Sequence, residues 1–243
     1  MGPNRPLRRT ILVVDIQGFN RPERSNPSRV KLRATLFALL EAALGRAEVN
    51  RRQYALGDTG DGAYLLIDSD VSEAALLESL MPELQLGLKE YNRGRRDAAM
   101  MRLRVVLHTG YVTKDAHGWA GGDLNFAFRL LDSRPLREEL RATSSPLALM
   151  VSEAVYEGVV RDGWGAIEPS EYRRVEFETK ETRGQAWLRS TGGEIPRHDR
   201  EPEARPVAAR QRDSSGGVIF ESGSTVDVGG DVIGGDQINY GRG

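Results

Sequence analysis

A short apolar run that ends in an acid and a glycine decides how this chain folds: residues 10 to 19 read TILVVDIQGF. The run from Thr10 to Ile16 is rich in β-branched residues and too short for a helix, which predicts a buried strand. Gly18 then predicts a tight turn. Asp15 therefore stands where a buried strand meets a turn, and its carboxylate lies beside free backbone N–H groups.

A second aspartate has a similar setting. Asp61 lies within TGDG at residues 59 to 62, and the apolar residues AYLLI follow it. Together with residues 53 to 56, this segment predicts a β-hairpin. Carboxylates are hard ligands that suit Mg²⁺ or Mn²⁺, and two of them can support a two-metal phosphoryl site. For either aspartate alone, a turn former or helix cap stays an open alternative.

Composition limits the class of protein. The chain has 243 residues, no cysteine and a net charge of −1, enough for one domain plus an appendage. The charge does not indicate a nucleic-acid or anionic membrane surface. The lack of cysteine excludes disulfides and a Cys nucleophile and suits a reducing cytosol. No apolar stretch approaches the ~20 residues of a membrane span. We therefore expect a cytoplasmic protein with no direct nucleic-acid binding and no membrane segment.

The chain divides into three predicted parts. Residues 1–191 form a domain in which strand and helix patterns alternate. Residues 192–217 are rich in Gly, Pro, Arg, Glu and Ser and have almost no large apolar side chains, which is typical of a flexible linker. Residues 218–243 form a Gly-rich, β-prone tail with a crude repeat of Gly-Gly-Asp. This tail could add a strand to a partner protein, or it is a disordered terminus.

The periodicity of residues 1–191 predicts a fold class. We expect helices over residues 28–48 behind Ser28 as N-cap, over 71–91, over 122–132 with Asp123 as cap, and from Ser152 to 161. We expect further strands at 103–108 and 111–113, broken at Gly110, and at 147–151, 172–177 and 185–188. His108 is expected to be a satisfied core or edge histidine. The order predicts an α+β, ferredoxin-like fold: a mostly antiparallel sheet covered by helices.

A polar pair stands out on the helix predicted at residues 122–132. Asn125 and Arg129 are four residues apart, which places both side chains on one helix face. The other face is apolar. An arginine fork beside an amide, at a Gly-rich helix start, suits a developing phosphate charge. A solvated polar stripe is the alternative interpretation.

Taken in order, these motifs resemble the class III nucleotidyl cyclase catalytic domain over about residues 8 to 190. The matching segments are VDIQGF at 14–19, GDG at 60–62, RVVLHTG at 104–110, and the pair Asn125 and Arg129. Lys180 falls where that family often keeps a phosphate-binding lysine, although the family's flanking glycine is absent.

The resemblance implies a site and a mechanism. Asp15 and Asp61 would hold two Mn²⁺ or Mg²⁺ ions per active site, with the Ile16 carbonyl as a further ligand. Backbone N–H groups at Gly18 and Phe19 would cradle the β- and γ-phosphates of a nucleoside triphosphate.

The resemblance also implies roles for the helix pair. Arg129 would stabilise the transferring phosphoryl group, and Asn125 would hold the ribose. In that family the metal acids come from one protomer and the Asn/Arg pair from the other. A homodimer with shared active sites is therefore implied.

Two departures concern the base. Purine-using members carry a Lys or Glu where this chain has Gly57, next to Asp58, and a polar side chain where it has Gly118. The resemblance is thus greatest to the pyrimidine cyclases of Pycsar antiphage systems, which use Mn²⁺ and whose product a separate effector reads. UTP is expected ahead of CTP. The residues that could read a smaller base are Tyr54, Asp58, His117 and Trp119.

Other functions remain open at this point. The chain could be a purine cyclase, an inactive cyclase-like nucleotide sensor that signals through its tail, or a different phosphoryl-transfer domain of ferredoxin-like topology. The intact residues Asp15, Asp61, Asn125 and Arg129 argue against an inactive sensor. The spacing of Asn125 and Arg129 argues against a different phosphoryl-transfer domain.

Overall fold

A mixed sheet organises the part of the chain that the computed structural model describes, residues 5–178 and 183–189. Its strand order is β2-β3-β1-β4-β6-β8-β7, and β5 pairs with β4 alone. The β4–β6 pair is parallel, and the other pairs are antiparallel. The strands are β1 (Leu7–Ile16), β2 (Tyr54–Asp58), β3 (Gly62–Asp68), β4 (Leu103–Lys114), β5 (Trp119–Ala120), β6 (Leu147–Ser152), β7 (Tyr172–Glu178) and β8 (Arg183–Arg189).

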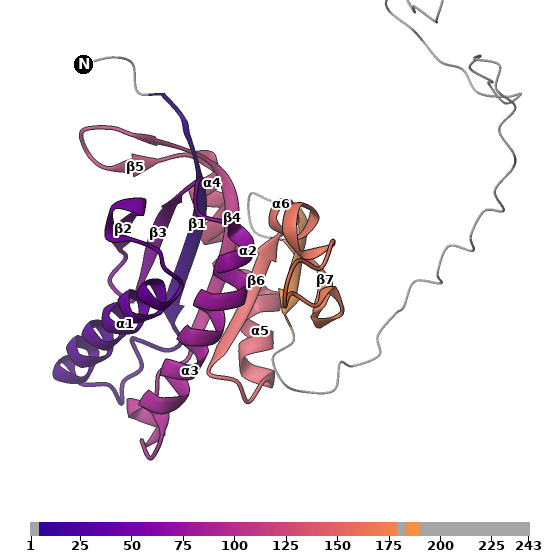
Figure 1. The fold of residues 1–243 in the computed structure, drawn as a ribbon. Helices are drawn as coiled ribbons and strands as arrows, with labels where there is room; N and C mark the ends of the chain where they lie inside the picture. Colours follow the sequence, from indigo (N-terminus) through magenta and orange to yellow (C-terminus); the bar gives the residue numbers. More distant parts are fainter. Residues whose placement is uncertain (1–4, 179–182, 190–243) are drawn as a thin grey trace, which may run out of the picture. The chain divides into compact units, whose positions relative to one another are not determined.

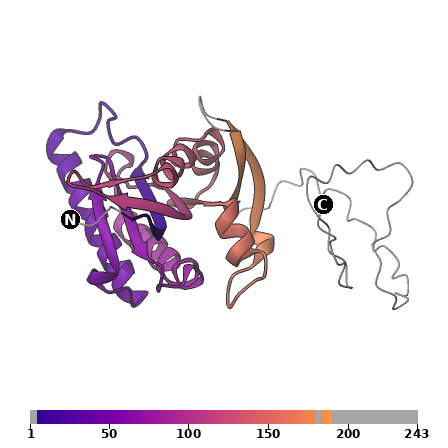
Figure 2. The same ribbon diagram turned by 90° about the horizontal axis from the view of Figure 1, so that it is seen from above.

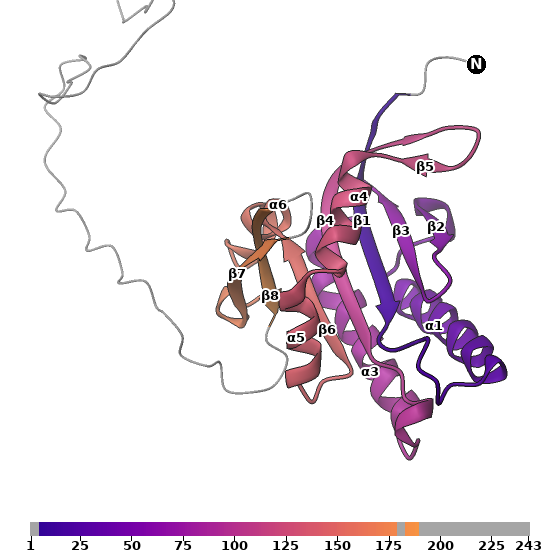
Figure 3. The same cartoon turned by 180° about the vertical axis from the view of Figure 1, so that it is seen from behind.

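Helices cover both faces of this sheet, which confirms the predicted α+β class. They are α1 (Asn26–Arg46), α2 (Glu73–Ala75), α3 (Met81–Asn92), α4 (Gly122–Leu131), α5 (Arg134–Ala142) and α6 (Glu153–Val155). α1 and α3 lie in front of the sheet in Figure 1, and α4 lies in front of it in the reverse view of Figure 3. Figure 2 shows β2 and β7 toward opposite ends of the sheet.

The apolar sequence of the central strand β1 follows from burial on both of its faces. Leu12 and Val14 pack into the core shared with α1 and α3, whereas Ile11 and Val13 pack into the core shared with α4 and α5. Both faces are buried, so the run is apolar throughout instead of alternating. Because side chains alternate along a strand, Asp15 follows on the α4 face.

Two local predictions were wrong. β4 is continuous through Gly110, which pairs with Arg9. A Cβ at Gly110 would overlap the Asp123 carboxylate, so the glycine serves close packing instead of a break. Asp123 does not cap α4, because the N-cap is Gly121 and the Asp123 carboxylate accepts the Tyr111 N–H.

The helix caps and interiors also differ from the sequence patterns. Ser25, not Ser28, is the N-cap of α1, and its Oγ accepts the Ser28 N–H. The helix expected at 71–91 is divided into α2, a π-helical segment at Leu76–Leu80, and α3. Ser152 occupies the N-cap position of α6, but no cap bond from its side chain forms.

Some predictions fall on residues outside the described ranges. These are Lys180, the linker at 192–217 and the tail at 218–243. Within residues 5–178 and 183–189, no helix combines the length and apolar content that a bilayer crossing needs.

Candidate metal and phosphate site

The fold brings the two predicted metal acids to neighbouring turns. Asp15, near the end of β1, pairs in register with Gly62, the residue after Asp61. The Ile16 N–H donates to the Asp61 carbonyl at 3.0 Å, which ties the two turns together. Position 62 must be glycine for this approach, because a Cβ there would overlap the Val14 carbonyl. Burial is the main cause of a raised pKa of Asp15, and the nearby charge of Asp61 adds to it.

The Asp15 carboxylate is buried and already has a partner. Only 7% of Asp15 is exposed. Arg104 stands opposite it in register on β4 and grips both carboxylate oxygens, with Nε 2.9 Å from Oδ1 and Nη2 on Oδ2. Burial raises the pKa of Asp15, and the Arg104 hydrogen bond and charge oppose that rise. The carboxylate is therefore held in a fixed orientation.

Arg104 is the residue whose role sequence reasoning missed. In the sequence, Arg104 is only the first residue of the RVVLHTG motif, and the motif itself assigns no chemistry to its side chain. The arginine becomes significant through the β1–β4 register, which no local pattern reveals. Its second Nη also lies 3.8 Å from Asp132, at the C-cap of α4.

The donors at these turns suit divalent cations. Asp15, Asp61 and the Ile16 carbonyl are all oxygen ligands, which Mg²⁺ and Mn²⁺ prefer. Within the described ranges, no group of three His, Cys, Asp or Glu side chains is arranged to hold a metal. Mg²⁺ commonly binds through one or two carboxylates with phosphates and waters as its other ligands, so two carboxylates fit a site that substrate completes.

The turn after β1 contains the predicted phosphate cradle. Gly18 has φ +63°, a left-handed conformation that favours glycine. The Phe19 N–H donates to the Ile16 carbonyl at 3.1 Å. The Phe19 N–H is therefore engaged within the turn and reaches a phosphate only if this bond opens, whereas the Ile16 carbonyl keeps a second lone pair for a cation.

The helix pair lies on α4. Asn125 is exposed and Arg129 is half-buried. Asn125 stands seven residues before Asp132, which corresponds to about 10 Å of helix. Asp132 is the α4-end residue whose carboxylate approaches Arg104. Asn125 therefore presents its amide to the exterior of this chain, away from that end of the helix.

The glycine at position 57 is fixed by packing. Gly57 on β2 stands opposite Tyr64 on β3, and a Cβ at Gly57 would overlap the Tyr64 ring. That ring packs edge-on against Phe128 of α4, with centroids 6.1 Å apart. Its neighbour Asp58 is engaged as well, since it pairs with Arg33 and accepts the Gly60 N–H.

The glycine at position 118 is fixed by backbone conformation. Gly118 lies in the β4–β5 turn with φ +135°. The Asp115 carboxylate accepts the N–H groups of His117 and Gly118. Of the other candidate base readers, Trp119 lies beside the Lys114 ammonium, and Tyr54 is buried in the core.

His108 lies in the core, as predicted, although only one of its ring nitrogens is hydrogen-bonded. Its Nδ1 is 2.8 Å from the Ser152 Oγ. Its Nε2 lies 3.7 Å from the Asp123 carboxylate and makes no hydrogen bond. Burial lowers the pKa of His108, and Asp123 opposes that effect.

Comparison with known proteins rests on the fold. No protein-family model and no curated protein sequence matches the chain. The guanylyl cyclase Cya2 is similar in structure, with 17% identity and a TM-score of 0.54 over 76% of this chain and 92% of that one. An adenylate/guanylate cyclase/hydrolase from Silicibacter pomeroyi gives 19% identity and a TM-score of 0.55 over 77% and 99%. A bacterial light-regulated adenylyl cyclase gives 13% and 0.51 over 75% and 90%. The chain therefore has the class III nucleotidyl cyclase fold that its motifs predicted.

Proposed function

We propose that the protein is a nucleotidyl cyclase, which converts a nucleoside triphosphate to its 3′,5′-cyclic monophosphate and pyrophosphate. The observation that carries this proposal is the meeting of Asp15 and Asp61 at two turns joined by the bond from Ile16 to Asp61. The class III fold supports it, because the solved structures with this fold include adenylyl and guanylyl cyclases.

The chain's own residues account for the chemistry. Asp15, Asp61 and the Ile16 carbonyl would hold two divalent ions, which lower the pKa of the ribose 3′-hydroxyl and neutralise the triphosphate when bound. The 3′-oxygen would lose its proton to solvent and attack the α-phosphorus in line, and the bond between the α-phosphorus and the bridging oxygen would break, so that pyrophosphate leaves. Arg104, once released from Asp15, would bind phosphate oxygens through its planar fork.

The helix pair would complete the site from a second protomer. Arg129 would stabilise the charge on the transferring phosphoryl, and Asn125 would orient the ribose. The exposed position of Asn125, about 10 Å along α4 from the Arg104 end, supports a role toward another chain. The proposed assembly is a homodimer in which each site takes its acids from one protomer and its Asn/Arg pair from the other.

The proposed substrate is a pyrimidine nucleotide, UTP ahead of CTP. Gly57 and Gly118 supply no side chain to read a purine, and each is constrained to be glycine. The Tyr64 ring fills the space beside Gly57, which favours a smaller base. We further propose Mn²⁺ as the metal and an antiphage role of the Pycsar kind, in which a separate effector reads the cyclic nucleotide. A purine substrate is the second candidate, since the similar structures include adenylyl and guanylyl cyclases.

A direct assay tests the proposed reaction. Purified protein is incubated with Mn²⁺ and each of the four ribonucleoside triphosphates, and the products are resolved by mass. We expect a cyclic monophosphate and pyrophosphate, most abundant with UTP or CTP. Asp61→Ala is expected to abolish the product, because it removes a ligand of the metal that the reaction needs.

A matched variant controls for the loss of a carboxylate in general. Asp162→Ala removes an exposed carboxylate outside the proposed site and is expected to keep full activity. Failure to form any cyclic product with the four nucleotides, in Mn²⁺ or Mg²⁺, would contradict the proposed activity. A preference for ATP or GTP would contradict only the pyrimidine assignment.

A further inference from the structure

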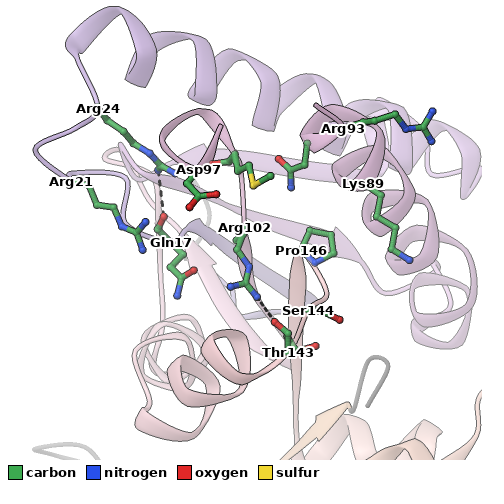
Figure 4. Close-up of a pocket in the computed structure, with 12 residues that line it drawn as sticks. Gln17, Arg21, Arg24, Lys89, Arg93, Asp97, Arg102, Thr143, Ser144 and Pro146 are labelled. Atoms are coloured by element: carbon green, nitrogen blue, oxygen red, sulfur yellow. Dashed lines mark hydrogen bonds between the residues drawn. The ribbon is translucent and has the colours of Figure 1, made fainter. Parts of the chain in front are cut away.

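A basic cavity lies at the end of the sheet, apart from the Asp15 carboxylate. Its volume is about 660 Å³. It is lined by the C-terminal part of α3, the turn after β1 and the loop between α5 and β6, as Figure 4 shows. Five of its lining residues are cations, namely Arg21, Arg24, Lys89, Arg93 and Arg102, and among the described lining residues the acid is Asp97.

Two of these guanidinium groups are fixed parts of the wall. Arg24 is 3% exposed and donates to the carbonyls of Ala98, Met100 and Gln17 at 3.1, 2.8 and 3.3 Å. Arg102 donates through Nη2 to three carbonyls at the C-terminal end of α5 and the loop after it, which are those of Leu140, Thr143 and Ser145. These partners carry no net charge, so within the described ranges neither guanidinium has an ion pair.

The remaining cations add to this excess charge. Burial lowers the pKa of both Arg24 and Arg102, and the nearby charge of Arg21 lowers each further. Within the described ranges, the side chains of Arg21, Lys89 and Arg93 have no hydrogen bond and no ion pair. Like charges held together in partly desolvated surroundings are unfavourable unless an anion joins them.

This cavity is distinct from the metal site but shares the turn after β1. None of Asp15, Asp61 and Arg104 is among the residues that line the cavity. Gln17 and Arg21 belong to the turn and line the cavity. Arg21 lies directly against the turn, because a Cβ at Gly18 would overlap its Nε.

We propose that this cavity is a second anion site, which binds a small molecule bearing a phosphoryl group. Arg21, Lys89 and Arg93 contact the anion, and Arg24 and Arg102 form the fixed positive wall behind them. Arginine forks match phosphate oxygens in geometry. The volume is within the range of small-molecule sites and accommodates an organic body as well as the phosphate. The binding claim does not depend on the proposed cyclase activity.

Titration of the metal-free protein tests this site. The full chain is titrated calorimetrically in EDTA and low salt with pyrophosphate, and separately with UMP. In the metal-free protein Arg104 is paired with Asp15, and the cavity variant leaves that pair intact, so the loss of signal in this variant assigns the binding to the cavity. We expect saturable binding of at least one probe, weakened at least tenfold in the variant Arg21→Gln/Lys89→Gln/Arg93→Gln. Tighter binding of UMP would assign an organic phosphate as occupant, and tighter binding of pyrophosphate an inorganic one.

A charge-matched variant separates a specific site from general attraction. Lys31→Gln/Arg52→Gln/Arg174→Gln removes the same charge from exposed positions outside the cavity and is expected to bind both probes as the wild type does. Circular dichroism verifies that each variant is folded, and Arg93→Gln alone replaces the triple variant if that one unfolds. The proposal is overturned if neither probe binds at millimolar concentration. It is also overturned if the two triple variants lose affinity equally. Where the single variants replace them, an equal loss in Arg93→Gln and Arg52→Gln overturns it. Asp61→Ala is expected to retain binding, so a failed cyclase assay leaves this result intact.

Discussion

At the residue scale, His108 couples the fold to pH. Its ring is buried against Phe126, with centroids 5.0 Å apart, and its Nε2 makes no hydrogen bond. Burial lowers its pKa below the ordinary value of 6.5. At a pH between the lowered pKa of the folded protein and the ordinary pKa of the unfolded chain, His108 binds more protons in the unfolded chain than in the folded one. The free energy of unfolding therefore falls as pH is lowered from about 6.5.

Replacement of this histidine should remove that part of the pH dependence. Urea unfolding of the wild type and of His108→Gln is compared at pH 7.5 and pH 5.5. We expect the wild type to lose more stability over this interval than the variant, because glutamine does not titrate. His117→Gln, in the exposed β4–β5 turn, is the control and should follow the wild type. Equal losses in all three proteins would show that His108 does not carry the effect.

At the scale of secondary-structure elements, the packing of the β2–β3 hairpin requires glycine at position 57, which has no side chain. The Tyr64 ring covers Gly57, so Gly57→Ala forces the ring to move. We expect a cost of roughly 1–3 kcal/mol in the free energy of unfolding, as for other overpacked positions. The same change in a Tyr64→Ala background should cost almost nothing, which a double-mutant cycle measures. Gly45→Ala is the control, since open space surrounds that glycine, and destabilisation as large as at Gly57 would contradict the packing argument.

The elements also show how far sequence reasoning reaches. β1 could be predicted because an uninterrupted apolar run buried on both faces leaves a local signature. Asp123 was misassigned because an acid at a helix start looks like a cap, while its partner is the Tyr111 N–H of strand β4. The helix α5 was not predicted, since its buried residues are only Leu136 and Leu140 among mostly charged neighbours. Asp15 and Asp61 could be proposed as metal ligands from their local turns, whereas the pairing of Arg104 with Asp15 depends on strand register.

At the scale of the whole molecule, the proposed shared site makes a quantitative prediction. Asp61→Ala and Arg129→Ala chains should each be inactive alone. After the two are mixed and reassociated at equal amounts, half of the dimers are mixed and each of these has one intact site of two. Cyclase activity should therefore recover to roughly a quarter of the wild-type value, as expected for two-fold symmetric dimers.

A second mixture is the control for this complementation. Asp15→Ala with Asp61→Ala places both defects in the acid half of the site, so no mixed dimer has an intact site. It should show no recovery in the same assay. Lack of recovery in the first mixture, or equal recovery in both, would contradict sites shared between protomers.

If Asp15 holds the metal and Arg104 the phosphate, as proposed, their contact would also determine which species enters most readily. A bare cation that binds the Asp15 carboxylate would leave the Arg104 guanidinium without a counterion in partly desolvated surroundings, where an unpaired charge is unfavourable. A free polyphosphate that binds the Arg104 guanidinium would leave the Asp15 carboxylate without a counterion instead. A divalent ion already chelated by phosphate oxygens gives each group a new counterpart in one exchange. The resting protein should therefore favour the preassembled salt of the nucleotide over either component offered separately.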